Sequence, residues 1–306
     1  MKKIGTVFSF CSNDYRFLKH CIEGVRPFSE QIIVTVCDHF FDGTQEHYGL
    51  LEAVYKQFPD VLFLEFAYSD KHSYRYASPL DSSHLLWRHE WHNTGRFIAY
   101  LLADPAVEYF YFCDGDEVTD GSRLLKWLEK GEFEHYDALR FASYWYFRSA
   151  KYRAMTTADM SLLIRREAID RGSLWSEHAR MGLYLHLQGR KREQVKDDLG
   201  VPFVHHFSWV RTEEEMCKKF AAWGHFWERD WQGLIREEYQ RPFGGQDFIR
   251  HYTYEEAVAP FDPLLEPVPE LPRGSLQEHI KRVSQYPHVR RVSYEETFRQ
   301  ELNFIS

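Results

Sequence analysis

Residues 108–118 read EYFYFCDGDEV, an aromatic run that stops at three acidic residues with one glycine among them. A continuous apolar run that ends in polar residues is typical of a strand buried on both faces of a sheet. Two carboxylates separated by one residue can converge on a hard divalent cation when the end of a strand holds them rigidly. A solvated turn is the alternative interpretation, and the buried strand before the acids favours the metal site.

Apolar runs, polar turns and segments of helical periodicity alternate along the chain before this stretch. The expected strands are 4–10, 30–38, 60–66 and 107–117, and the expected helices are 15–25, 49–58 and 84–104. This alternation indicates βαβ units and therefore an α/β fold with a mostly parallel sheet flanked by helices. Ligands of such sheets bind beyond the carboxyl ends of the strands, so Asp38 and the acids 114–117 are expected to face one crevice.

The pattern loosens after residue 120, where strand-like and helical segments follow in less regular order. We expect one α/β domain over residues 1–215, divided into halves 1–120 and 121–215. Residues 216–306 are expected to form a helical C-terminal extension, which ends in a proline-rich wrapping tail.

Composition excludes some classes of protein. The net charge of −8 argues against a nucleic-acid-binding protein, which needs an excess of Lys and Arg on one face. The five cysteines show no zinc or disulfide spacing, which fits a reducing cytoplasm. No apolar window reaches the length of a membrane span, although peripheral contact with a membrane stays open.

Several motifs resemble those of known glycosyltransferases. Residues 8–44, FSFCSNDYRFLKHCIEGVRPFSEQIIVTVCDHFFDGT, resemble the opening of GT-A glycosyltransferases of the family 2 type. Residues 91–118, WHNTGRFIAYLLADPAVEYFYFCDGDEV, resemble the later segment in which an Asn-x-Gly helix precedes the DxD strand. The shorter HHFSWVRTEEEMCKK at 205–219 is similar to the His-x-Ser-Trp segment of family 17-related enzymes, which transfer N-acetylglucosamine.

The resemblance implies a metal-dependent glycosyltransferase with a GT-A fold, a nucleotide half over 1–120 and an acceptor half over 121–215. It implies a UDP-sugar donor, Mn²⁺ or Mg²⁺, and a saccharide or lipid-linked acceptor. A divalent cation stabilises the charge that develops on the departing diphosphate. The residues implied for the donor are Ser12, Asp38, Asn93, Asp114, Arg211 and Lys218, with Lys219 a further candidate, and those for the metal are Asp114, Asp116 and His206.

His205 and His206 end an apolar run, so alternation along a strand points one ring to the core and the other to the crevice. A strand-end histidine is often a satisfied polar residue rather than a ligand. The His-x-Ser-Trp pattern selects His206 as the candidate ligand. Aromatic residues at 143–147 (SYWYF) and Trp175 are interpreted as half-buried core, with a sugar-stacking platform as the alternative.

Inverting enzymes of family 2 activate the acceptor with a carboxylate at the start of a helix. The family pattern, aligned backward from Gly189, places its acidic pair on Glu177 and His178, and the base stays open between these two residues. Glu177 is preferred, with the pair Asp197 and Asp198 in reserve, and inversion is expected. A Glu favoured by the helix dipole is the structural alternative.

Two other functions compete with a glycosyltransferase. A nucleotidyltransferase requires a loop rich in Gly and in Lys or Arg after the first strand, which FCSNDYRF at 10–17 lacks. A catalytically inactive sugar-binding protein would keep the fold and lose turnover.

Overall fold

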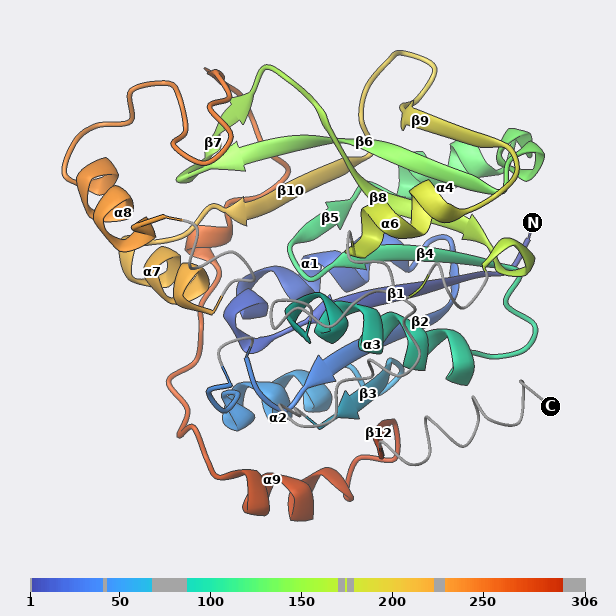
Figure 1. The fold of residues 1–306 in the computed structure, drawn as a ribbon, viewed down its shortest axis with the longest axis horizontal. Coiled ribbons are helices and arrows are strands. Elements are labelled where there is room, and N and C mark those ends of the chain that lie inside the picture. Colours follow the sequence, from blue (N-terminus) through green and yellow to red (C-terminus); the bar gives the residue numbers. More distant parts are fainter. Residues whose placement is uncertain are drawn as a thin grey trace.

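The computed structural model describes residues 2–40, 43–67, 87–169, 174, 179–222 and 229–293, with the backbone alone for 87–92 and 179. Within these ranges a twelve-stranded sheet crosses the molecule, and helices pack on both of its faces (Figure 1).

The sheet is parallel on one side of its central strands and mixed on the other. Its order is β12-β3-β2-β1-β4-β8-β6-β7-β11, with β10 paired to β5 and β6, and β9 paired to β6. Neighbours from β12 to β4 run parallel, whereas β8 is antiparallel to both β4 and β6. The strands are β1 Ile4–Phe10, β2 Ser29–Cys37, β3 Leu62–Phe66, β4 Tyr109–Asp114, β5 Glu117–Thr119, β6 Ala138–Phe147, β7 Ser149–Ala154, β8 Ala158–Arg165, β9 Lys191–Val195, β10 Val204–Trp209, β11 Tyr254–Glu256 and β12 Val289–Val292.

Strand β4 contains the aromatic run, and it separates two hydrophobic cores. Tyr109 and Tyr111 pack into the core on one face, and Phe110 and Phe112 pack into the core on the other. Successive side chains of a strand point to opposite faces, so a strand covered on both faces has to be apolar at every position. The run ends where this cover ends, at Asp114.

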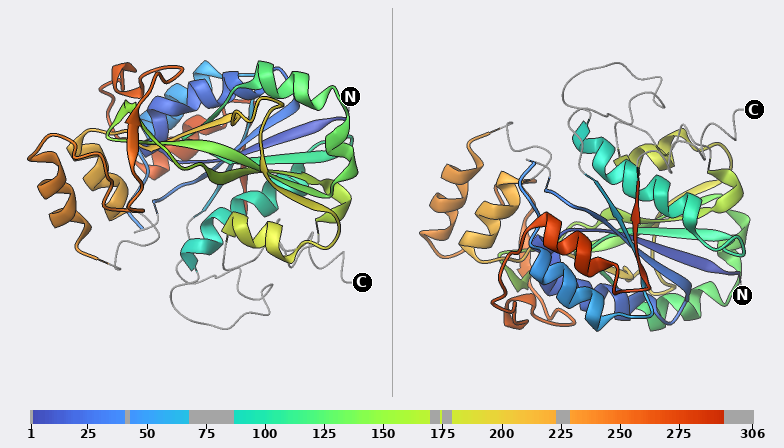
Figure 2. Two further views of the ribbon diagram at one scale, coloured as in Figure 1. Left: turned by 90° about the horizontal axis from the view of Figure 1, so that it is seen from above. Right: turned by 90° about the horizontal axis from the view of Figure 1, so that it is seen from below.

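Two layers of helices cover the sheet (Figure 2). Buried residues of α1, α2 and α4 form the core on one face, and those of α3 and α6 form the core on the other. Among the described residues no helix is both long and apolar enough to span a bilayer. The helices are α1 Tyr15–Val25, α2 Tyr48–Gln57, α3 Trp87–Leu102, α4 Gly121–Leu128, α6 Ala179–His186, α7 Glu213–Ala221, α8 Trp231–Tyr239 and α9 Leu276–Val283.

A third, aromatic core holds α7 and α8 against the end of β10. Trp209 of β10 stacks on Phe220 of α7 with ring centroids 4.9 Å apart, and Phe220 lies 4.7 Å from Trp231 of α8. A capping box between Thr212 and Glu215 fixes the start of α7. These contacts determine which residues of α7 point toward the sheet.

Helix α1 lies against β5 and the start of α4 with almost no space between the backbones. A Cβ added to Gly121 would lie 1.8 Å from the carbonyl oxygen of Gly24, and one added to Gly24 would lie 2.4 Å from that of Thr119. Both positions therefore require glycine. This contact fixes the last turn of α1 against β5 and the start of α4.

The C-terminal extension is fixed to the N-terminal half by a buried network of charges. His279 of α9 is fully buried, and its ring nitrogens lie 2.7 Å from Glu65 Oε1 and 3.2 Å from Glu52 Oε1. Arg282 approaches Glu52 at 2.8 Å, and Arg291 of β12 approaches Glu65 at 3.3 Å. We call these five residues the tail network, which joins α9 and β12 to α2 and β3.

The α/β fold predicted from the sequence, a sheet flanked by helices, is confirmed in its architecture. The four strands expected before residue 120 correspond to β1, β2, β3 and β4. Helices α7, α8 and α9 and strand β12, which pairs in parallel with β3, lie in the C-terminal part of the chain. The predicted domain boundary at residue 215 falls within α7 and stays a prediction.

The tail network predicts a pH-dependent contribution to stability. Burial alone lowers the pKa of His279, but the hydrogen bonds and charges of Glu65 and Glu52 outweigh it and raise the pKa above 6.5. Protonated His279 therefore stabilises the fold fully below about pH 6.5, and this contribution is lost as the pH rises through the raised value. At pH 6 we expect His279→Gln to lower the free energy of unfolding by about 1–3 kcal/mol in urea titrations, and by less at pH 8. The exposed His186→Gln is the control, and equal losses at both pH values would contradict a charged His279.

Candidate active site

The acidic turn after β4 lies beside the end of β1 and the strand β10. Ser9 of β1 pairs with Asp114, and the Gly115 amide donates to the Ser9 carbonyl at 3.0 Å. On the other side Glu117 of β5 pairs with His206 of β10. The loop after β1 and the strand β10 thus flank the acids.

The third acid, Glu117, is a structural residue that orders the turn. It is 0% exposed, and the Arg180 guanidinium donates to its two oxygens at 2.5 and 2.8 Å. Ser161 donates to Oε2 at 2.9 Å, and the Asp114 amide donates to the same oxygen at 3.3 Å. Burial lowers the pKa of Arg180, but the charges of Asp114 and Glu117 outweigh it and raise the pKa overall.

Arg180 also links the turn to the first acid. Its Nη2 lies 3.4 Å from Asp114 Oδ2, and Arg96 of α3 lies 3.9 Å from Asp114 Oδ1. Burial lowers the pKa of Arg96 to about 10, so both guanidinium groups remain protonated near neutrality. Asp114 is therefore held between two cations.

The second acid, Asp116, is 3% exposed and lies among cations from the far side of the crevice. Lys219 Nζ donates to Asp116 Oδ2 at 2.7 Å, and Arg211 lies 3.7 Å from the same oxygen. Lys219 is also 3.5 Å from Asp14 Oδ1, and Arg211 donates to Asp14. Burial raises the pKa of Asp116, but Lys219, His206 and Arg211 hold it well below its ordinary value overall.

His206 and His205 point to opposite sides of β10. His206 is buried beside Asp116, with Nε2 3.3 Å from Asp116 Oδ1. His205 lies with its Nδ1 2.9 Å from the Tyr146 hydroxyl, and burial lowers its pKa to about 4. His206 is therefore the histidine that lies in the crevice.

The side chains around Asp116 offer few free donors for the divalent metal expected from the sequence. Asp116 Oδ1 and His206 Nε2 are close enough to share an ion, but Oδ2 of Asp116 already binds an ammonium group. Over the described ranges no cluster of three His, Cys, Asp or Glu side chains could hold a metal ion. The residues present do not fit a resident divalent ion, which requires several oxygen ligands.

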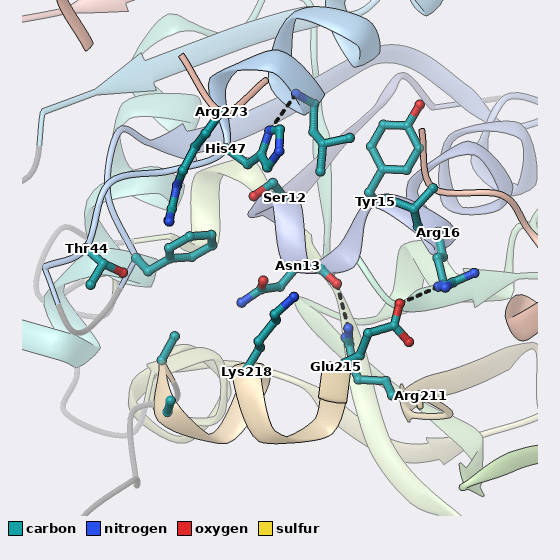
Figure 3. A pocket seen from close by; sticks show the side chains of 15 residues that line it. Ser12, Asn13, Tyr15, Arg16, Thr44, His47, Arg211, Glu215, Lys218 and Arg273 are labelled. Atoms are coloured by element: carbon teal, nitrogen blue, oxygen red, sulfur yellow. Dashed lines mark hydrogen bonds and ion pairs between the residues drawn. The ribbon is translucent and has the colours of Figure 1, made fainter. Parts of the chain in front are cut away.

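Two adjoining cavities open at the acidic turn, and they share Asn13, Phe40 and Ala222. The first, which we call the basic cavity, has a volume of about 340 Å³ (Figure 3). The second, the carboxylate cavity, has a volume of about 200 Å³. The charged residues that line the basic cavity are Arg16, Arg211, Glu215, Lys218 and Arg273, and those of the carboxylate cavity are Asp14, Asp114, Asp116, Lys219 and Arg250.

The basic cavity lies between the loop after β1, the start of α2, helix α7 and the tail. Lys218 reaches from α7 toward Asn13, and Arg273 and His47 extend from the opposite wall (Figure 3). Four cationic side chains and one carboxylate line this cavity, which suits an anionic ligand. The carboxylate cavity is also lined by the indole rings of Trp145 and Trp209, each of which is 4% exposed.

Seven of the residues predicted from the sequence line these cavities. Ser12, Arg211 and Lys218 line the basic cavity, and Asp114, Asp116, His206 and Lys219 line the carboxylate cavity. Their roles in donor or metal binding remain predictions. The donors of Arg211 are used by the Ser208 and Asn13 carbonyls and by Asp14, so its main contact is with the loop after β1.

Asp38 and Asn93 line neither cavity. Asp38 is buried and binds His39 at 2.7 Å and Arg291 of the tail at 3.0 Å. Asn93 is buried in α3 and accepts from Arg96 at 3.4 Å, which places it behind Asp114.

The predicted bases Glu177 and His178 lie outside the described residues. The reserve pair lies in the loop between β9 and β10, where Asp197 accepts from the Leu199 and Val201 amides. Neither Asp197 nor Asp198 lines the two cavities.

Several site residues were missed in the sequence. Arg180 had no signal, because the partner of a buried acid is set by tertiary contact. Asp14 follows the quoted FSFCSN and was a visible candidate at the end of the first strand. Glu46 is fully buried and accepts from the Ser12 amide at 3.1 Å, and burial raises its pKa to about 7.

Comparison with known proteins gives likenesses of fold only. No protein-family description and no curated protein sequence matches the chain. Among solved structures, residues 1–349 of TarS from S. aureus match 72% of this chain and 65% of their own, with 12% identity and a TM-score of 0.40. The glycosyltransferase GlyE of Streptococcus pneumoniae matches 81% of this chain and 67% of its own, with 12% identity and a TM-score of 0.37.

A third solved structure is 4-diphosphocytidyl-2C-methyl-D-erythritol synthase from Anaerococcus prevotii. It matches 74% of this chain and 99% of its own, with 10% identity and a TM-score of 0.37. Because every one of these scores is below 0.5, we derive neither activity nor site residues from them.

The buried pair of Glu117 and Arg180 generates a stability prediction. Arg180→Gln should lower the free energy of unfolding by about 3–5 kcal/mol, because it leaves Glu117 buried without its charge partner. Urea denaturation of Arg180→Gln and of the exposed control Arg192→Gln measures the difference. In a double-mutant cycle the further change Glu117→Gln should restore part of the loss. A loss below about 1 kcal/mol for Arg180→Gln would contradict this role.

Proposed function

We propose that the chain is a glycosyltransferase that moves a hexosyl or N-acetylhexosaminyl group from a UDP-sugar to a saccharide or lipid-linked acceptor in the cytoplasm. The adjoining basic and carboxylate cavities carry this proposal. A nucleoside diphosphate needs cations, which the basic cavity provides. Its sugar needs polar partners and aromatic surface, which the adjoining carboxylate cavity provides.

The charges of the crevice support this division. Lys218 and Arg273 line the basic cavity from opposite walls, and Lys219 lies in the carboxylate cavity. A diphosphate at the boundary of the two cavities comes within reach of cations from α7. A sugar beyond it enters the space lined by Asp114, Trp145 and Trp209.

The proposed transfer breaks the bond between the anomeric carbon and the diphosphate oxygen, and the electron pair stays on the diphosphate. The acceptor hydroxyl forms the new bond from the opposite face and loses its proton to a base, with inversion. We assign the base to Glu177, with His178 beside it in the sequence. Because the described residues do not fit a resident divalent ion, no step is assigned to Mn²⁺ or Mg²⁺.

A panel of nucleotide sugars tests the function. Thermal shift identifies the donor, because a ligand that binds only the folded state raises its melting temperature. Release of nucleoside diphosphate on addition of saccharide acceptors then reports transfer. Pyrophosphate release from a nucleoside triphosphate would indicate a nucleotidyltransferase, and donor binding without turnover across all acceptors would indicate an inactive sugar-binding protein.

Lys218 generates a prediction for donor affinity. Its side chain is 63% exposed, with Glu214 2.8 Å away, so its loss should leave the fold intact. Lys218→Ala should weaken UDP binding about tenfold in calorimetry, as expected for one charge-assisted phosphate contact. Lys3→Ala, which breaks another exposed ion pair, is the matched control. Equal affinities would remove Lys218 from the donor site.

The assignment of the base is tested at Glu177. Glu177→Gln should lower the rate by about a hundredfold or more while UDP affinity stays unchanged, as expected for loss of a general base. NMR of the product should show inverted configuration at the anomeric carbon. Normal turnover of Glu177→Gln would transfer the role to His178 or elsewhere, and a retained configuration would refute inversion.

A further inference from the structure

A lysine lies where the resemblance to metal-dependent enzymes predicts a divalent cation. Lys219 Nζ is 2.7 Å from Asp116 Oδ2 and 3.5 Å from Asp14 Oδ1, so one ammonium group bridges two carboxylates. Its side chain is 15% exposed and lines the carboxylate cavity. The ammonium is thus both anchored to the acids and accessible to a ligand.

The packing of α7 determines the position of Lys219. The capping box at Thr212 fixes where α7 begins, and the stacking of Phe220 on Trp209 fixes how the helix is rotated. The Lys219 ammonium also lies 5.4 Å from the centre of the Trp209 ring, which is a cation–π contact.

The remaining partners of Asp116 leave little room for an ion. Arg211 approaches Oδ2 at 3.7 Å, and His206 lies 3.3 Å from Oδ1. A divalent ion would have to displace the ammonium from a buried carboxylate and would bring further positive charge close to Arg211. An ammonium needs no such rearrangement, and it presents its remaining donors to the cavity.

We propose that Lys219 is the resident cation of this donor site, so that the nucleoside diphosphate binds without a divalent metal. The inference rests on the proposed function. When the bond between the anomeric carbon and the diphosphate oxygen breaks, the electron pair remains on that oxygen, and the ammonium stabilises the added charge. Asp116 and Asp14 hold the Lys219 ammonium in place through the two ion pairs.

The first test measures metal binding without any nucleotide. Electron paramagnetic resonance of Mn²⁺ should show no stoichiometric binding to the wild-type protein at concentrations up to about 1 mM. Lys219→Met removes the charge and keeps the stem over Trp209, and it should gain a weak Mn²⁺ site at Asp116 and His206. A single micromolar Mn²⁺ site in the wild type that is lost in Asp116→Ala would overturn the inference.

The second test measures UDP affinity by calorimetry in EDTA and in Mn²⁺. The wild type should bind equally in both buffers, and Lys219→Met should bind about tenfold or more weakly in EDTA. Lys219→Arg, which keeps the charge, should retain most of the affinity, and Lys3→Ala should match the wild type.

The outcomes separate this inference from the proposed function. UDP binding that requires Mn²⁺ overturns the role of Lys219 and leaves the glycosyltransferase proposal standing. Binding in EDTA that Lys219→Met does not weaken also overturns it. Absence of binding by any nucleoside diphosphate in either buffer overturns both proposals together.

Discussion

The three carboxylates at the end of β4 impose one electrostatic constraint on the whole molecule. They follow a buried strand within four residues, so cations from elsewhere in the chain must neutralise them. Buried charges are costly unless they are paired, so later parts of the chain must supply these partners. Arg96 comes from α3, Arg180 from α6 and Lys219 from α7. The acids thus act as the point on which three separate helices converge, and one of these helices, α7, contributes residues to both cavities.

Much of the fold could be predicted from the sequence because the signals are local. Between residues 4 and 117, continuous apolar runs alternate with helical segments. Each run is apolar throughout because its strand is buried on both faces of the sheet. Strand β12 left no such pattern. Its four residues, VRRV, are half polar, so they show no strand pattern of their own. They pair with β3, which lies about 220 residues earlier in the sequence.

The site was less predictable because most of its contacts join residues that are distant in the sequence. Asp114, Asp116 and His206 could be named because strand ends and spacing are visible in a sequence. Their partners could not be, since nothing local specifies that Arg180 meets Glu117. Asp38 shows the converse case, because its position at the end of β2 was predicted correctly, yet its side chain is directed to Arg291 of the tail. The direction of a carboxylate side chain at the end of a strand thus depends on elements that come later in the chain.

The addition of β12 to the outer side of β3 bears on how the protein is synthesised. Until residues 279–292 have left the ribosome, β3 is an edge strand with unpaired backbone groups, and Glu65 lacks its partners His279 and Arg291. Contacts that span so much of the sequence raise the contact order and slow the final folding step. The nascent N-terminal half is therefore the stage most exposed to edge-to-edge aggregation, and its edge is covered only after residues 289–292 have been synthesised.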